Sequence, residues 1–138
     1  MAMLDTTVFV DLRGRGGKQR TVKAQETLAQ LVAGGESLST SRITVAELYV
    51  GIQLSMDPAA EKLAVEEALE GFPILELDDV AARHFANIRA YLRRRSRTVG
   101  DMDTLIGGIA LANGQPVVTR NPAHFSDMPG LRVITYGA

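Results

Sequence analysis

Short apolar runs alternate with segments of helical length along the whole chain, and this alternation limits the folds open to it. The strand-like runs begin just before Leu4 and recur at residues 37–40, 73–77, 116–119 and 131–136. Helical segments are predicted at residues 22–33, 43–54, 58–70, 79–96 and about 101–113. Short apolar strands separated by helices indicate an α/β fold with a mostly parallel sheet. The length of 138 residues predicts one domain.

Two of the predicted helices carry clear apolar patterns. Residues 43–54 are apolar on nearly all sides, which predicts a buried helix. Residues 79–96 are amphipathic, and the side chains expected to face inward are Ala81, Phe85, Ile88 and Leu92.

The composition excludes several kinds of site. The chain has no cysteine, so disulfides, thiolate metal ligands and a cysteine nucleophile are all absent. His84 and His124 are the only histidines, too few for a zinc site built mainly on imidazole. The net charge of −1 is not that of a strongly basic nucleic-acid-binding domain. Since neither a signal peptide nor a long apolar span is evident, we expect a cytoplasmic protein with no membrane partner.

Three acidic residues, Asp5, Glu47 and Asp103, each stand within a strongly apolar stretch. Asp5 and Thr119 would lie at the carboxyl ends of strands, and Asp103 at a helix N-terminus nearby. Functional residues gather at that edge of a parallel sheet. Carboxylates that converge there repel one another unless a cation is present, and Mg²⁺ or Mn²⁺ matches their oxygen ligands. The sequence therefore predicts a metal-dependent enzyme.

Each acid also has a simpler explanation. Asp5 could cap a helix or form an Asx-turn. Glu47 follows Thr44 at the spacing of a capping box, although the helix is expected to begin before Thr44. Asp101 and Asp103 would suit the positive end of a helix dipole. The mid-helix pair Gly107-Gly108 favours a role for Asp103 in the site, because it indicates a close helix–sheet approach that would hold Asp103 at the rim.

Four motifs occur in a characteristic order. They are Leu-Asp-Thr-Thr-Val-Phe from Leu4, Ile-Thr-Val-Ala-Glu-Leu-Tyr-Val-Gly-Ile from Ile43, Gly-Asp-Met-Asp-Thr-Leu-Ile from Gly100, and Val-Val-Thr-Arg-Asn-Pro-Ala-His-Phe from Val117. Together they resemble the PIN-domain ribonucleases, specifically the VapC-type toxins of bacterial and archaeal toxin–antitoxin pairs. The resemblance runs from Leu4 to about Tyr136.

The resemblance implies a single PIN domain over residues 1–138, a three-layer α/β/α fold with a mostly parallel central sheet. It implies RNA cleavage that depends on Mg²⁺ or Mn²⁺, a homodimer, and a cognate VapB-like antitoxin that blocks the site. The family acids fall on Asp5, Glu47 and Asp103. Asp5 and Asp103 would hold the metal directly, and Glu47 would hold it or orient a water molecule.

Several positions near these acids remain secondary candidates. The fourth family position, often Asp, is Asn121 here, which weakens a second metal site, and Asp101 could partly compensate. Thr6 and Thr119 are expected to hydrogen-bond near the acids. His124 could approach the site or serve the structure.

Two basic segments and two rival functions stay open. Arginines in the 13–20 and 89–97 segments could contact RNA, although Arg89, Arg93 and Arg97 also fit a solvated helix face near a C-terminus. A phosphatase with an aspartyl nucleophile is disfavoured because Thr7 occupies its second Asp position. The other rival is a PIN-fold module with weak catalysis that acts through antitoxin and operator binding.

Overall fold

A computed structural model describes residues 1–136 of the chain. Five parallel strands form one sheet in the order β3-β2-β1-β4-β5. Their bounds are Ala2–Leu4 for β1, Leu38–Ser41 for β2, Ile74–Leu75 for β3, Val117–Thr119 for β4 and Val133–Thr135 for β5. All pairs are parallel, with Leu4 in register with both Thr40 and Val118. The predicted α/β fold with a parallel sheet is confirmed.

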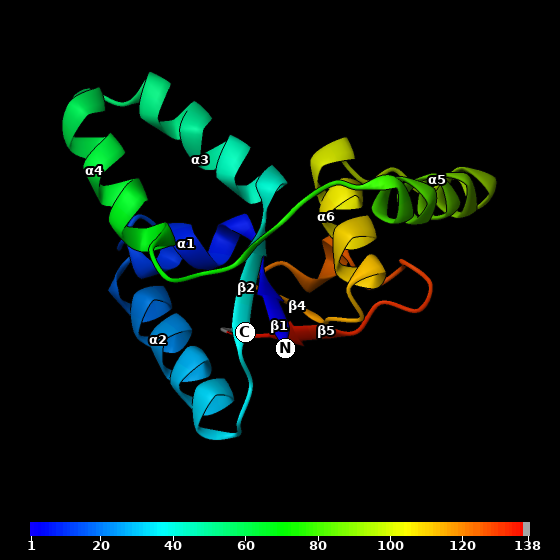
Figure 1. The fold of residues 1–138 in the computed structure, drawn as a ribbon, viewed down its shortest axis with the longest axis horizontal. Coiled ribbons are helices and arrows are strands. Elements are labelled where there is room, and N and C mark those ends of the chain that lie inside the picture. The colour runs from blue at the N-terminus through cyan, green and yellow to red at the C-terminus, as the bar shows by residue number, and fades with distance from the viewer. Residues whose placement is uncertain (137–138) are drawn as a thin grey trace.

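Helices cover both faces of this sheet (Figure 1). They are α1 (Thr6–Leu12), α2 (Lys18–Ala33), α3 (Arg42–Leu54), α4 (Pro58–Leu69), α5 (Asp79–Arg94) and α6 (Asp101–Ala112), with a short 3₁₀ helix, η1, at Pro122–His124. Alternate strand residues point to opposite faces. Met3 and Val117 pack with α5 and α6, whereas Leu4 and Val118 pack with α1 to α4. The result is three layers with two apolar cores.

This topology places the candidate site. Strand β1 lies in the centre of the sheet, and β1 and β4 end side by side, at Leu4 and Thr119. Asp5 follows β1 directly and caps α1. Residues that follow β4 therefore come within reach of Asp5.

Several element predictions need correction. Helix α1 is not apparent in the sequence, because Thr-Thr-Val-Phe-Val is rich in β-branched residues that favour strands. Helix α2 begins at Lys18 rather than at the predicted residue 22. The prediction relied on apolar spacing, and the first turn of the helix is wholly polar. Helix α5 ends at Arg94, and Ser96 follows it with a left-handed φ of 53°. Arg97 therefore leaves the helix and does not share a stripe with Arg89.

Helix α3 is not buried on all sides. Val45, Leu48 and Ile52 face the core, but Tyr49 and Val50 are more than half exposed and Leu54 is 81% exposed. Tyr49, Val50 and Leu54 therefore form an exposed apolar stripe on the outer side of the helix. In α5, Ala81, Ile88 and Leu92 are buried as predicted, and Phe85 is partly exposed.

The glycine pair in α6 serves a contact other than the predicted helix–sheet approach. A Cβ at Gly108 would lie 2.9 Å from Ala81 O and 3.0 Å from Phe85 N, both in the backbone of α5. A Cβ at Gly107 would collide with the Met128 side chain. The glycines therefore let α6 pack closely on α5 and on the loop before β5. In residues 1–136, no helix combines the length and the apolar character needed to cross a membrane.

Candidate active site

Asp5 is the buried centre of the candidate site, with 2% of its surface exposed. It is the N-cap of α1, and its Oδ1 accepts hydrogen bonds from Thr7 N at 3.0 Å and Val8 N at 3.4 Å. The Thr7 hydroxyl also donates to Oδ1, at 2.5 Å. The Thr119 hydroxyl donates to Oδ2 at 2.5 Å. Asp5 is thus a helix cap, as the simpler explanation supposed, and is also joined to the end of β4.

Burial raises the pKa of Asp5 from 3.8 to about 6. Hydrogen bonds from Thr119, Thr7 and Val8 oppose this rise, and the negative charge of Asp103 adds to it. An ionised carboxylate in such a setting is stabilised by an added cation.

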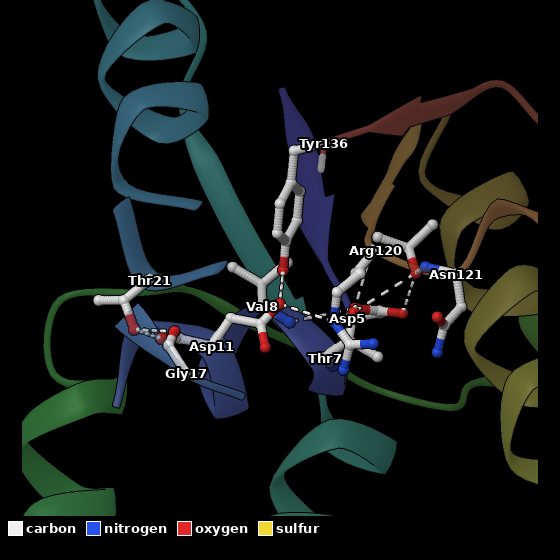
Figure 2. A network of polar contacts seen from close by, with 10 residues as sticks. Asp5, Thr7, Val8, Asp11, Gly17, Thr21, Arg120, Asn121 and Tyr136 are labelled. Carbon is white, nitrogen blue, oxygen red and sulfur yellow. Dashed lines mark hydrogen bonds and ion pairs between the residues drawn. The ribbon is translucent and has the colours of Figure 1, made fainter. Parts of the chain in front are cut away.

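The two hydroxyls that hold Asp5 are themselves oriented by the backbone. Thr7 Oγ1 accepts a hydrogen bond from Arg120 N, and Thr119 Oγ1 accepts one from Asn121 N, each at 3.0 Å. Each hydroxyl is left to donate its proton to Asp5. Figure 2 shows Asp5 and Thr7 within this network of polar contacts. Asn121 enters the site through this backbone N–H. No sequence pattern pointed to Thr7 as a site residue beyond its place two residues after Asp5.

Glu47 is held by Thr6 rather than by a capping box. Helix α3 begins at Arg42, and the Ser41 side chain accepts from Thr44 N at 3.1 Å, so Ser41 is the cap. Glu47 lies further along the helix, where its Oε1 accepts a 2.5 Å hydrogen bond from the Thr6 hydroxyl. Because Thr6 follows Asp5 directly, this bond links Glu47 of α3 to the start of α1, next to Asp5.

Asp103 lies in the first turn of α6 and is partly buried, with 26% of its side chain exposed. The negative charge of Asp103 contributes to the raised pKa of Asp5. His124 in η1 holds Asp103 through a 2.8 Å contact between Nδ1 and Oδ2. Of the two interpretations of His124 from the sequence, the structure supports an approach to the candidate site.

Asp101 points to a different partner. Its side chain is 77% exposed and pairs with Arg89 of α5. Arg89 also donates to Val99 O at 3.1 Å, which fixes the guanidinium between α5 and the start of α6. In this arrangement Asp101 does not take the place of a fourth site acid.

Several residues of the two basic segments also have partners. Arg13 and Arg15 both pair with Glu61 of α4. Arg97 pairs with Asp127 at 2.5 Å, and Arg95 stacks on Tyr91. These contacts leave little support for a phosphate site at Arg13 or Arg15.

The acidic residues fit a divalent cation in part. Within residues 1–136, no three His, Asp or Glu side chains are grouped closely enough to hold a metal ion together. The structure thus does not bring Asp5, Glu47 and Asp103 into one ligand group. Asp5 and Asp103 still offer a pair of carboxylates whose charges interact. Mg²⁺ keeps several of its waters and is commonly bound through one or two carboxylates, so this pair suits it.

The family of the chain follows from its sequence. The family model described as PIN domain matches residues 2–131. The chain belongs to the PIN-domain family. The VapC-type resemblance of its four motifs is confirmed, because relatives of this PIN domain carry that name. It is 37% identical over 102 residues to the tRNA(fMet)-specific endonuclease VapC of Salmonella typhimurium, covering 70% of this chain and 77% of the relative. It is 30% identical over 130 residues to Ribonuclease VapC2 of Haemophilus influenzae, covering 94% and 93%.

Solved structures of VapBC complexes share the fold of this PIN domain. The DNA-bound VapBC of Salmonella typhimurium contains a chain that is 30% identical, with a TM-score of 0.82 over 96% of this chain and 97% of that one. VapBC2 of Rickettsia felis, bound to a promoter fragment, gives a TM-score of 0.87 at 22% identity, over 99% and 98% of the two chains. The three-layer α/β/α architecture predicted from the resemblance is confirmed.

Proposed function

We propose that this PIN domain is a VapC-type endoribonuclease toxin that hydrolyses RNA phosphodiester bonds with Mg²⁺ or Mn²⁺. Its relatives named as VapC ribonucleases support the reaction class. The observation that carries the metal proposal is the buried Asp5 carboxylate, whose pKa burial raises to about 6, with the negative charge of Asp103 adding to that rise. Asp5 and Asp103 would hold the ion.

The side chains of the site divide the work. A bound divalent ion supplies positive charge to stabilise negative charge that develops on the phosphodiester. Thr7 and Thr119 hold the Asp5 carboxylate in one orientation, and His124 does the same for Asp103. Thr6 fixes Glu47 through Oε1, and within residues 1–136 no protein group holds Oε2, which would orient a water molecule.

We further propose that the toxin pairs with a VapB-like antitoxin and forms a homodimer in the cytoplasm. The support for the antitoxin is that structural neighbours are VapBC complexes, including one at 30% identity. The exposed stripe of α3, at Tyr49, Val50 and Leu54, offers apolar surface for such contacts.

Cleavage of RNA by the purified protein tests this function. We expect strand breaks with Mg²⁺ or Mn²⁺, none with a chelator, and loss of about 100-fold or more in Asp5→Asn and Asp103→Asn, since even positioning residues around metals cost 10–100-fold. Circular dichroism should show both variants folded. Cleavage that persists at full rate in chelator would contradict the metal proposal. Absence of cleavage under all conditions, with retained antitoxin binding, would favour the catalytically weak module.

A further inference from the structure

A buried acid outside the three site carboxylates anchors an arginine at the rim of the sheet. Asp11 lies near the end of α1 and is fully buried. Its Oδ2 accepts from Arg120 Nε at 2.8 Å and from the Tyr136 hydroxyl at 2.9 Å. Burial and the bond to Asp11 raise the pKa of Tyr136, so its hydroxyl stays a donor. Figure 2 shows Asp11, Arg120 and Tyr136 in the same network of polar contacts as Asp5.

The binding mode of Arg120 leaves its outer nitrogens available. A guanidinium has five N–H donors, and Arg120 uses Nε alone for Asp11. No partner of its two terminal nitrogens is found in the part of the chain from Met1 to Tyr136. The side chain is 21% exposed. The anchored group can therefore still reach a ligand from solvent.

Four arginines of the two basic segments differ in this respect. Arg13, Arg15, Arg89 and Arg97 all meet a carboxylate through a terminal nitrogen. One outer nitrogen of each is thus already committed to a protein acid. Arg120 differs because Asp11 holds its Nε and leaves both terminal nitrogens for a ligand.

The position of Arg120 ties it to the candidate site. Its backbone N–H donates to Thr7 Oγ1, and the same hydroxyl donates to Asp5. Arg120 also follows Thr119, the other hydroxyl donor to Asp5. The guanidinium is therefore carried by the segment that builds the carboxylate site.

We propose that Arg120 binds a phosphate oxygen of the RNA strand beside the Asp5 site, with Asp11 and Tyr136 as its positioning residues. This inference rests on the proposed function. The planar fork of a guanidinium matches two phosphate oxygens, and a lysine ammonium does not reproduce that geometry. A phosphate entering this rim meets the negative charges of Asp5 and Asp103, so hydrogen-bond donors fixed beside them favour its binding.

Binding of a fluorescent single-stranded RNA, followed by anisotropy in chelator at several KCl concentrations, tests the contact. Removing Arg120 alone would leave the buried Asp11 charge unpaired, so the main variant is the double Asp11→Asn/Arg120→Gln, which removes both charges. We expect its RNA affinity to fall about tenfold. The slope of log affinity against log salt should also fall by about 0.7, the value for one phosphate contact on a single strand.

Three further variants separate a phosphate contact from a structural role. Asp11→Asn keeps the guanidinium and should keep the wild-type salt slope, with a smaller loss of affinity. Arg120→Lys keeps one charge and should preserve the slope but not the affinity. Arg83→Gln is the control, because Arg83 is exposed on α5 and pairs with Asp79. Its affinity and slope should equal those of the wild type.

Several outcomes would overturn the contact. One is a folded double variant with wild-type affinity and slope. Another is a double variant that still binds RNA but no longer binds a VapB-like antitoxin. That result would show that the Arg120 guanidinium binds a carboxylate of the antitoxin instead. Wild-type protein that binds no RNA would also overturn it. Wild-type protein that binds RNA through Arg120 but cleaves none with Mg²⁺ would overturn the proposed function and support the contact.

Discussion

The hydroxyl of Thr119 donates a 2.5 Å hydrogen bond to Asp5 Oδ2, joining the ends of β4 and β1 across 114 positions of sequence. Thr119 is fully buried, and its oxygen accepts from Asn121 N. The proton of this hydroxyl is thereby directed to Asp5. The bond favours the ionised form of a carboxylate that burial disfavours.

Thr119→Val should raise the pKa of Asp5 further above 6, because valine fills the space but donates nothing. Hydrogen bonds to charged groups contribute about 1.5–3 kcal/mol, which corresponds to a rise of about one pKa unit or more. A ¹³C titration of the aspartate carboxyl carbons by NMR measures this change. Thr119→Ser retains the hydroxyl and should titrate as the wild type does. An unchanged pKa in the valine variant would show that the hydroxyl does not act on Asp5.

Asp5→Asn should change the pH dependence of stability. The folded-state pKa of Asp5 is raised above 3.8, so its protonated form favours folding. The contribution of Asp5 to stability is therefore largest below pH 3.8 and falls as pH rises to about 6. The free energy of unfolding of the variant relative to the wild type should increase by about 3 kcal/mol across that window.

Urea unfolding in chelator at several pH values measures this difference. Asp78→Asn is the control, because Asp78 caps α5 through Ala81 N and asparagine caps helices as well. If Asp5→Asn and Asp78→Asn show the same pH dependence relative to the wild type, the raised pKa of Asp5 is wrong.

Gly108→Ala should destabilise the protein, because the new Cβ would press on the α5 backbone at Ala81 and Phe85. Overpacking of this kind typically costs about 1–3 kcal/mol. Gly51→Ala is the matched helical control. Gly51 lies inside α3 with no atom within 4 Å of a Cβ, so alanine should stabilise the protein by up to about 1 kcal/mol. Thermal unfolding compares the two variants. Equal effects would show that α5 and α6 are not packed as closely as described.

Much of the fold could be predicted, because it follows from local patterns. The alternation of strands and helices appears in the apolar spacing, and Asp5 and Thr119 stand at strand ends by simple position. Helix α1 could not be predicted this way, since its β-branched residues favour a strand until the Asp5 cap sets the helix. The exposure of Tyr49 and Val50 depends on which side of α3 meets the core.

The candidate site could be predicted as far as its acids and the hydroxyls of Thr6 and Thr119, which hydrogen-bond to Glu47 and Asp5 as expected. The bonds from Asp11 to Arg120 and Tyr136 join residues 109 and 125 positions apart, and no local pattern encodes them. Asp101 and Asp103 both lie in the first turn of α6, and in the sequence only the glycine pair and the family resemblance favour Asp103 over Asp101. Tertiary partners separate them, because Arg89 takes Asp101 and His124 takes Asp103.

That separation allows the most direct test of the central claim, that Asp5 and Asp103 hold one divalent ion. Mn²⁺ binding by electron paramagnetic resonance should show one site in the wild type and in Asp101→Asn, with similar affinities. Asp103→Asn and Asp5→Asn should weaken that site by about 100-fold or more. Equal Mn²⁺ affinity in Asp103→Asn and Asp101→Asn, or no Mn²⁺ bound by the wild type, would contradict the account.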